Sequence, residues 1–290
     1  MPDLLLCVSA FSGGGNAVKI APKVARILSQ RGWKVHILYT KDKSLCDIAA
    51  NTEYDYIAAL GGDGYISSIA YGVWKTGKTL MPLPAGRGND FCRKLGIGAN
   101  SVKYLENKEF FVSENIDVAL SKDNMGDEKI ILGILSLGID SVSNHYANMN
   151  SFLSGMLVYL WGFYKAVREF KPLTYKITVD GQYFEATSWT LGICSSGIYG
   201  GGIKLIPFSD LKDGLLDVIT TDNISFFSFL KLICKIPSGK HIYSSNVQIL
   251  QCTEITIDCD SKFLPYADGD LAGKLPITVK VLPSDLKIIY

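Results

Sequence analysis

The chain has 290 residues, of which 48% are hydrophobic and 20% are charged, a composition typical of a globular protein with a substantial core. Its formal net charge is +1 and no cluster of lysine and arginine occurs, which argues against a nucleic-acid-binding protein. The seven cysteines are scattered without C-x-x-C spacing, so we expect reduced thiols and neither a disulfide framework nor a cysteine metal site.

The N-terminus lacks the basic segment of a signal peptide, so residues 4–8 are predicted to form a first strand. No apolar run reaches the roughly 18 residues that a membrane-spanning helix needs. We therefore expect a cytoplasmic protein.

Strands and helices alternate over the first 95 residues. Predicted strands cover residues 4–8, 35–40, 55–60 and 79–83, and predicted helices follow them at residues 21–31, 44–50, 65–75 and 90–95. The first helix is placed from Ala21 because Pro22 is tolerated only in a first helical turn. This order predicts a parallel α/β sheet of the nucleotide-binding kind, about 110 residues long.

Glycine-rich turns follow three of these strands, at residues 9–15, 61–64 and 84–91. Glycines let a backbone approach a ligand closely, and the N-terminus of the following helix offers N–H groups that favour a phosphate. Asp63, in Gly61-Gly62-Asp63-Gly64, would repel a phosphate unless a metal ion or a donor intervened. The turn alone therefore suggests nucleotide phosphates with Mg²⁺, and an ordinary strand-to-helix turn with an aspartate near the N-cap stays an alternative.

From about residue 111 the pattern changes to short strands separated by turn residues such as Asp180-Gly181 and Asp268-Gly269. Strands are predicted at residues 111–120, 129–137, 173–179, 188–194, 215–220, 254–259 and 277–282. The main helical interruption is residues 151–170. We expect an α/β domain over residues 1–114, completed by a C-terminal strand at 285–290, and an antiparallel β-sandwich domain over 115–284.

Two apolar stretches of the second domain are candidates for contact with a membrane surface. Residues 152–161 are almost entirely apolar, and residues 224–236 include Phe226, Phe227, Phe229, Leu230, Leu232 and Ile233 together with Lys231 and Lys235. Helices packed on the core are the commoner interpretation of both stretches.

A fourth glycine-rich stretch, Gly200-Gly201-Gly202, is followed by Asp210 and Asp213. Two carboxylates with nearby main-chain carbonyls suit a cation that prefers oxygen ligands, such as Mg²⁺. The alternative is a capped turn before a strand.

Together these motifs resemble the diacylglycerol kinase catalytic-domain family, which includes bacterial lipid kinases and sphingosine kinases. The resemblance extends over the whole chain and rests on five blocks in order: residues 9–13, 61–64, 86–91, 199–202 with 213–217, and Asp268-Gly269-Asp270. NAD kinases share the Gly-Gly-Asp-Gly turn and a related architecture, but the later blocks resemble the lipid-kinase branch.

The resemblance implies transfer of the γ-phosphoryl group of ATP to a lipid hydroxyl, with the nucleotide between the two domains. It implies that Asp63 and Asp90 are tied through water to a catalytic Mg²⁺, that Asp213 with the carbonyls of Asp210 and Leu215 holds a structural Mg²⁺, and that Asp270 accepts the proton from the lipid hydroxyl. The residues expected to bind ATP are Ser9, Phe11, Ser12, Gly13, Thr40, Gly61, Gly62, Asp63, Gly64, Tyr65, Ser67, Ser68, Gly86, Arg87 and Asn89.

Asp268 is included with Asp270 in the predicted catalytic set. If the stretch is extended, the two carboxylates face the same side, and their repulsion raises one pKa and favours a base. From the residues alone, a hairpin turn at Asp268-Gly269 is the more ordinary interpretation.

The chain departs from the family pattern at several positions. Ser9-Ala10 replaces Asn-Pro, Ser67-Ser68 replaces Asn-Glu, and Tyr65, Tyr71, Arg87 and Asp270 replace Thr, Asn, Thr and Glu. Tyr65 is bulky enough to crowd a nucleotide, whereas Arg87 adds a side chain suited to phosphate oxygens. These departures bear on the substrate more than on the fold.

The leading hypothesis is an ATP- and Mg²⁺-dependent kinase of diacylglycerol or a related lipid alcohol that touches the membrane surface transiently. The alternatives are a non-catalytic protein that binds lipid or nucleotide and a kinase of a soluble alcohol. The identity of the lipid, the choice between ATP and GTP, and the oligomeric state, including a homodimer, stay open.

Overall fold

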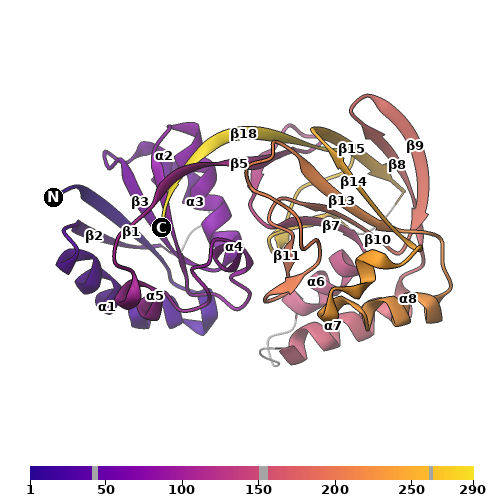
Figure 1. Ribbon diagram of the computed structural model, residues 1–290, viewed down its shortest axis with the longest axis horizontal. Helices are drawn as coiled ribbons and strands as arrows, with labels where there is room; N and C mark the ends of the chain where they lie inside the picture. Colours follow the sequence, from indigo (N-terminus) through magenta and orange to yellow (C-terminus); the bar gives the residue numbers. More distant parts are fainter. Residues whose placement is uncertain (41–44, 150–155, 261–263) are drawn as a thin grey trace. The chain divides into compact units, whose positions relative to one another are not determined.

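The computed structural model describes residues 1–40, 45–149, 156–260 and 264–290 (Figure 1). The chain divides into two compact units. Residues 1–118, 200–202 and 282–290 form the first unit, and residues 119–199 and 203–281 form the second. The chain changes unit within two long strands, β5 (Ser113–Lys122) and β18 (Ile277–Ile289).

The first unit is a parallel sheet with helices on both faces, as the alternation of elements predicts. Its strands lie in the order β2 (Lys34–Thr40), β1 (Asp3–Ser9), β3 (Tyr56–Gly61), β4 (Thr79–Pro84), and the end of β18 pairs in parallel with β4 through Lys287 and Ile288. β4 is buried along its whole length, which explains its continuous apolar sequence.

Four helices cover this sheet. Figure 1 shows α1 (Asn16–Gln30) and α5 (Ser101–Asn107) on one face and α2 (Leu45–Asn51) and α3 (Asp63–Lys75) on the other. The predicted start of the first helix at Ala21 is wrong, because α1 begins five residues earlier and contains Pro22. Proline removes one hydrogen bond to the carbonyl four residues before it, and that residue, Val18, is exposed to water.

The second unit is a sandwich of two mostly antiparallel sheets. In one sheet the order is β18, β15 (Glu254–Cys259), β8 (Leu173–Val179), β9 (Gln182–Ser188); β5 also pairs with β18, and β6 (Glu128–Ile131) pairs with β5. In the other sheet the order is β14 (Val247–Cys252), β13 (Leu216–Thr221), β10 (Thr190–Cys194), β7 (Ile134–Gly138), β16 (Tyr266–Ala267), β17 (Asp270–Leu271). Inward-facing side chains such as Tyr175 and Ile257 from the first sheet and Leu191 and Val218 from the second form one core. The predicted sandwich is confirmed.

Three helices lie on one side of this sandwich (Figure 1). They are α6 (Ile139–Met149), α7 (Met156–Glu169) and α8 (Phe226–Ile233), and they share an apolar cluster around Trp189. The sequence analysis did not predict α6, whose core-facing residues are interrupted by buried Ser141 and Asn144. Residues 151–155 of the predicted helix at 151–170 lie outside the described residues.

The predicted strand at residues 129–137 is two strands, β6 and β7, separated by Leu132-Gly133. The backbone N–H groups at this break donate to the carboxylate of Asp268, so they are not available to a continuous strand. Within the described ranges, no helix is both long enough and apolar enough to span a membrane.

Candidate active-site residues

Three glycine turns of the first unit pack against one another at the carboxyl ends of β1, β3 and β4. A Cβ atom on Gly86 would lie 2.4 Å from the Cα of Gly62, and one on Gly13 would lie 2.4 Å from the carbonyl oxygen of Ala85. Neither position has room for a side chain. The glycines identified in the sequence are therefore required by this backbone packing as well as by any ligand.

Hydrogen bonds hold the same turns together. The Gly62 N–H donates to Oγ of Ser12 at 3.2 Å, and the Ser12 hydroxyl donates to Oγ of Ser9 at 2.7 Å. Asn89 is buried in the left-handed conformation, where its side chain accepts from the Gly86 N–H and donates to the Gly86 carbonyl. Ser9, which departs from the family pattern, thus links the first turn to the second through Ser12.

Asp63 and Asp90 come from different turns and converge on Gly88. A Cβ atom on Gly88 would lie 2.9 Å from Oδ2 of Asp63 and 3.3 Å from Oδ2 of Asp90. Oδ1 of Asp63 accepts the Phe91 N–H at 3.2 Å. In the described part of the chain, no group of three or more His, Cys, Asp or Glu side chains could hold a metal ion. Asp63 and Asp90 would therefore supply a cation with two protein carboxylates and no third ligand of these types. Two carboxylates fit Mg²⁺, which keeps several waters and also binds substrate phosphates.

Asp90 also binds the fourth glycine-rich stretch, a contact that the sequence analysis missed. Its Oδ1 accepts the N–H groups of Gly201 at 2.9 Å and Gly202 at 2.7 Å. Burial raises the pKa of Asp90, and these donors oppose that rise. Arg93 packs on Gly202 and donates to the Gly88 carbonyl, so α4 (Asp90–Lys94) fixes both ends of this arrangement.

Tyr65 packs back on Gly61, the first residue of the turn that precedes it. Its hydroxyl is 2.9 Å from Oγ1 of Thr40, which in turn donates to the Val8 carbonyl, and its ring covers Gly61 so closely that a Cβ there would lie 2.4 Å from the ring. Burial raises the pKa of the Tyr65 hydroxyl. The tyrosine therefore packs at the ends of β2 and β3, where Thr40 and Gly61 also lie.

The remaining residues predicted to bind ATP differ in accessibility. Ser67 is buried in α3, and the Ser68 hydroxyl donates to the Gly64 carbonyl within the helix. Phe11 and Arg87 are exposed at the tips of their turns. An exposed guanidinium at Arg87 is accessible to a phosphate.

In the second unit, Asp268-Gly269 is a two-residue turn between β16 and β17, and both residues have positive φ. The condition that Asp268 and Asp270 lie on one extended stretch is therefore not met. The Asp268 carboxylate accepts three backbone N–H groups, from Leu132 at 3.0 Å, Gly133 at 2.8 Å and Ile134 at 3.1 Å. Asp270 follows the turn and is exposed.

Polar side chains of α6 contact this turn and its surroundings. The Asn148 amide donates to the Gly269 carbonyl at 3.0 Å, Nδ1 of His145 is 3.2 Å from the Tyr266 hydroxyl, and Asn144 donates to the Tyr199 hydroxyl. Burial and the charge of Asp270 raise the pKa of Tyr266. These contacts of α6 are not predictable from the sequence, because nothing in residues 139–149 marks a helix that binds the turn before Asp270.

Asp210 and Asp213, the predicted ligands of a structural Mg²⁺, lie on an exposed loop before β13. Their Oδ1 atoms accept the N–H groups of Lys212 at 3.1 Å and Leu215 at 3.0 Å. In both cases the aspartate side chain accepts a backbone N–H two residues later, which is the hydrogen bond of an ordinary Asx turn. A second oxygen of each carboxylate and the neighbouring carbonyls are the donor set that a hard cation would use.

Known proteins share the two-part architecture of this chain. Residues 3–121 match the family described as diacylglycerol kinase catalytic domain, and residues 133–290 match the YegS C-terminal NAD kinase beta sandwich-like domain. A diacylglycerol kinase of Mycobacterium tuberculosis is 29% identical over 96% of this chain and 92% of its own length. A diacylglycerol kinase of Bacillus subtilis is 25% identical over 79% of this chain and 75% of its own length.

Solved structures agree on the fold. The crystal structure of a putative diacylglycerol kinase from Bacillus anthracis superimposes with a TM-score of 0.76 at 22% identity, covering 100% of this chain and 96% of that one. The glycine turns, the sandwich and these matches over nearly the whole sequence lead to one conclusion. The chain belongs to the diacylglycerol kinase catalytic-domain family and is a lipid kinase.

Proposed function

We propose that this lipid kinase transfers the γ-phosphoryl group of ATP, with Mg²⁺, to the hydroxyl group of diacylglycerol or a closely related lipid alcohol. The observation that carries the proposal is the convergence of Asp63 and Asp90 on Gly88, within a group of glycine turns whose backbones approach too closely for side chains. Relatives called diacylglycerol kinases support the choice of acceptor.

The glycine turns bind the nucleotide phosphates in this proposal. Backbone N–H groups at the start of α3 and the exposed guanidinium of Arg87 face an anionic ligand favourably. Asp63 and Asp90 would hold Mg²⁺ through water. When bound, that ion neutralises charge that develops on the transferring phosphoryl group. Asp213, with the carbonyls of Asp210 and Leu215, would hold a second, structural Mg²⁺.

Asp270 is the proposed general base. Its carboxylate accepts the proton of the lipid hydroxyl, the hydroxyl oxygen bonds to the γ-phosphorus, and the bond from the γ-phosphorus to the bridging oxygen breaks to release ADP. Asp268, which the sequence analysis grouped with the catalytic residues, has a different proposed role. Because it accepts three N–H groups, it fixes the turn that carries Asp270 and takes no proton.

The test is transfer of radiolabelled γ-phosphate from ATP to a panel of alcohols in mixed micelles: diacylglycerol, monoacylglycerol, a sphingoid base and glycerol. We expect label in diacylglycerol, loss of transfer when Mg²⁺ is chelated, and loss in Asp63→Asn. Label in glycerol alone would replace the lipid acceptor by a soluble one. ATP binding without transfer to any alcohol would instead support a non-catalytic binding protein.

A further inference from the structure

Two stretches of the second unit contain no acidic residue. Residues 141–168 hold Lys165 and Arg168, and residues 223–253 hold Lys231, Lys235 and Lys240, but neither stretch contains Asp or Glu. The chain as a whole has nearly equal numbers of acidic and basic residues, 28 and 29. Both stretches therefore carry a net positive charge.

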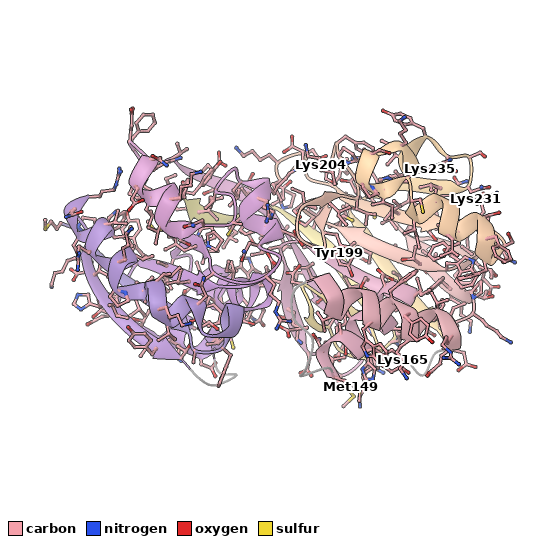
Figure 2. All side chains as sticks on the ribbon, turned by 90° about the horizontal axis from the view of Figure 1, so that it is seen from below. Met149, Lys165, Tyr199, Lys204, Lys231 and Lys235 are labelled. Atoms are coloured by element: carbon pink, nitrogen blue, oxygen red, sulfur yellow. The ribbon has the colours of Figure 1, made fainter. Side chains whose placement is uncertain are left out.

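The fold brings both stretches to one side of the sandwich. α7 and α8 pack on the same apolar cluster around Trp189. Figure 2 shows this side, with Lys165 on α7, Lys231 on α8 and Lys235 just after the end of α8.

The outward face of α8 places an aromatic ring beside the lysines. Phe229 and Leu232 face the core, whereas Phe227 is 74% exposed and Lys231 follows it one helical turn later on the same face. Lys235 is exposed in the turn just after the end of α8. The Phe227 ring contacts the ring of Phe226, with centroids 5.9 Å apart, but most of the side chain is exposed to water. Lysines beside it can keep their charged ends in water above an apolar surface.

α7 repeats the arrangement. Trp161 is 39% exposed and Tyr164 is 51% exposed. Lys165 lies over the Trp161 ring at 5.2 Å, and Arg168 lies over the Tyr164 ring at 5.6 Å. Aromatic rings with cations beside them are typical of surfaces that meet the boundary between lipid headgroups and acyl chains.

We propose that the docking face, made of Trp161, Tyr164, Lys165, Arg168, Phe227, Lys231 and Lys235, binds the surface of an anionic lipid bilayer. A second copy of the chain fits this face poorly, because a symmetric contact would bring lysine against lysine. Anionic headgroups complement the positive charge, and the rings insert among them. The inference rests on the proposed function in one respect, namely that the acceptor is a lipid.

The docking face is connected to the turn that carries Asp270. α7 crosses α6 at Gly162, where a Cβ atom would lie 2.3 Å from the Ser143 carbonyl oxygen. α6 in turn binds the Gly269 carbonyl through Asn148. Docking on a bilayer would therefore anchor the helix pair that supports the proposed base. Residues 152–155 of the apolar stretch predicted to touch membrane lie outside the described residues.

The test is cosedimentation of the full chain with vesicles of phosphatidylcholine alone or mixed equally with phosphatidylglycerol. We expect binding to the mixed vesicles only, weakened by salt. The double variant Lys231→Gln/Lys235→Gln should bind about 25-fold more weakly, at roughly 5-fold for each charge. Phe227→Ser should bind at least 10-fold more weakly.

Matched controls lie on the strands of the same unit. Lys176→Gln/Lys280→Gln removes two exposed charges from β8 and β18, and Tyr183→Ser removes an exposed ring from β9. These variants should bind like the native chain. Equal loss in the controls, no preference for phosphatidylglycerol, or a dimer that α8 variants dissociate in sedimentation velocity would overturn the proposal.

A second readout separates this inference from the proposed function. Transfer to a short-chain diacylglycerol dispersed as monomers requires no bilayer, so the α8 variants should retain native activity on it. Vesicle binding by a native chain that phosphorylates no lipid would refute the proposed function and leave the docking face supported. Transfer to monomeric diacylglycerol without vesicle binding would support the proposed function and refute the docking face.

Discussion

In the first unit, Asp63 and Asp90 belong to different turns, and each binds a backbone N–H through Oδ1 while Oδ2 lies near Gly88. In the second unit, Asp268 and Asp270 belong to one turn, and Asp268 alone accepts the three N–H groups that hold it. In the proposed function, each residue of the first pair combines anchoring with ligand binding. The second pair separates the two roles, with Asp268 as the anchor and the exposed Asp270 as the proposed base. Substitutions should therefore have mixed effects in the first unit and separable effects in the second.

The largest effect is expected where the turns of the first unit touch. Gly86→Ala places a methyl group 2.4 Å from the Cα of Gly62, so the two turns must separate. A displacement of about 1 Å is enough for a loss of roughly 100-fold in activity. We expect at least that loss in ATP affinity, measured by titration calorimetry.

Gly72→Ala is the control for this variant. Its methyl group would collide with the Cys46 carbonyl at 2.1 Å, but this contact lies between α2 and α3 and away from the glycine turns. It should lower the thermal midpoint while the folded fraction binds ATP normally. Equal loss of affinity in both variants would contradict the special role of the turns.

Removal of the anchoring carboxylate in the second unit should cost stability. Asp268→Ala leaves the N–H groups of Leu132, Gly133 and Ile134 without their acceptor and places alanine at positive φ. We expect a decrease of about 2–4 kcal/mol in the free energy of unfolding, measured in urea. Asp270→Ala should change it by less than about 0.5 kcal/mol. Similar values for the two variants would remove the distinction between the residues.

The helix that supports this turn should respond to pH. Burial raises the pKa of Asp140, in the first turn of α6, from 3.8 to about 6. The folded chain then holds this proton more tightly than the unfolded chain, so its contribution to stability falls as pH rises from about 4 to about 6. The thermal midpoint of native protein relative to Asp140→Asn should decrease over that range, with a change worth about 1–2 kcal/mol. A difference that stays flat over this pH range would refute the assignment.

The smallest effect concerns a single hydrogen bond to the turn. Asn148→Ala removes the donor to the Gly269 carbonyl, and we expect kcat to fall about 5-fold because the turn is held less firmly. Asn124→Ala is a matched control, since it removes a similar bond to the Leu275 carbonyl elsewhere in the unit. An equal decrease in both variants would indicate a general loss of stability and no specific support of Asp270.

Much of the first unit could be predicted because its signals are local. The glycine turns directly follow apolar strands, and parallel strands bring their carboxyl ends to one edge of the sheet, where open α/β sheets bind ligands. The contact of Asp90 with Gly201 and Gly202 could not be predicted in this way, because 111 residues separate Asp90 from Gly201 and no periodic pattern records such a pairing.

In the second unit several strands are predicted from the sequence, but β9, β14 and the interruption between β6 and β7 are not. The break at Leu132-Gly133 depends on the Asp268 carboxylate, 135 residues away from Gly133. The hydrogen bonds from Leu132, Gly133 and Ile134 to Asp268 are equally long-range and could not be predicted. An aspartate before a glycine has the same local sequence in a simple hairpin as in a turn that is bound to another strand. α6 was missed because its buried Ser141 and Asn144 interrupt the apolar spacing by which amphipathic helices are recognised.

The most direct test compares two conservative substitutions in one assay: transfer of γ-phosphate from ATP to diacylglycerol by Asp270→Asn and by Asp268→Asn. Asparagine keeps an acceptor oxygen and tolerates positive φ, so Asp268→Asn should fold and retain at least a tenth of native kcat. Asp270→Asn cannot take a proton and should lose 1,000-fold or more while still binding ATP. Comparable activity in the two variants would contradict the assignment of Asp270 as the base and Asp268 as its anchor.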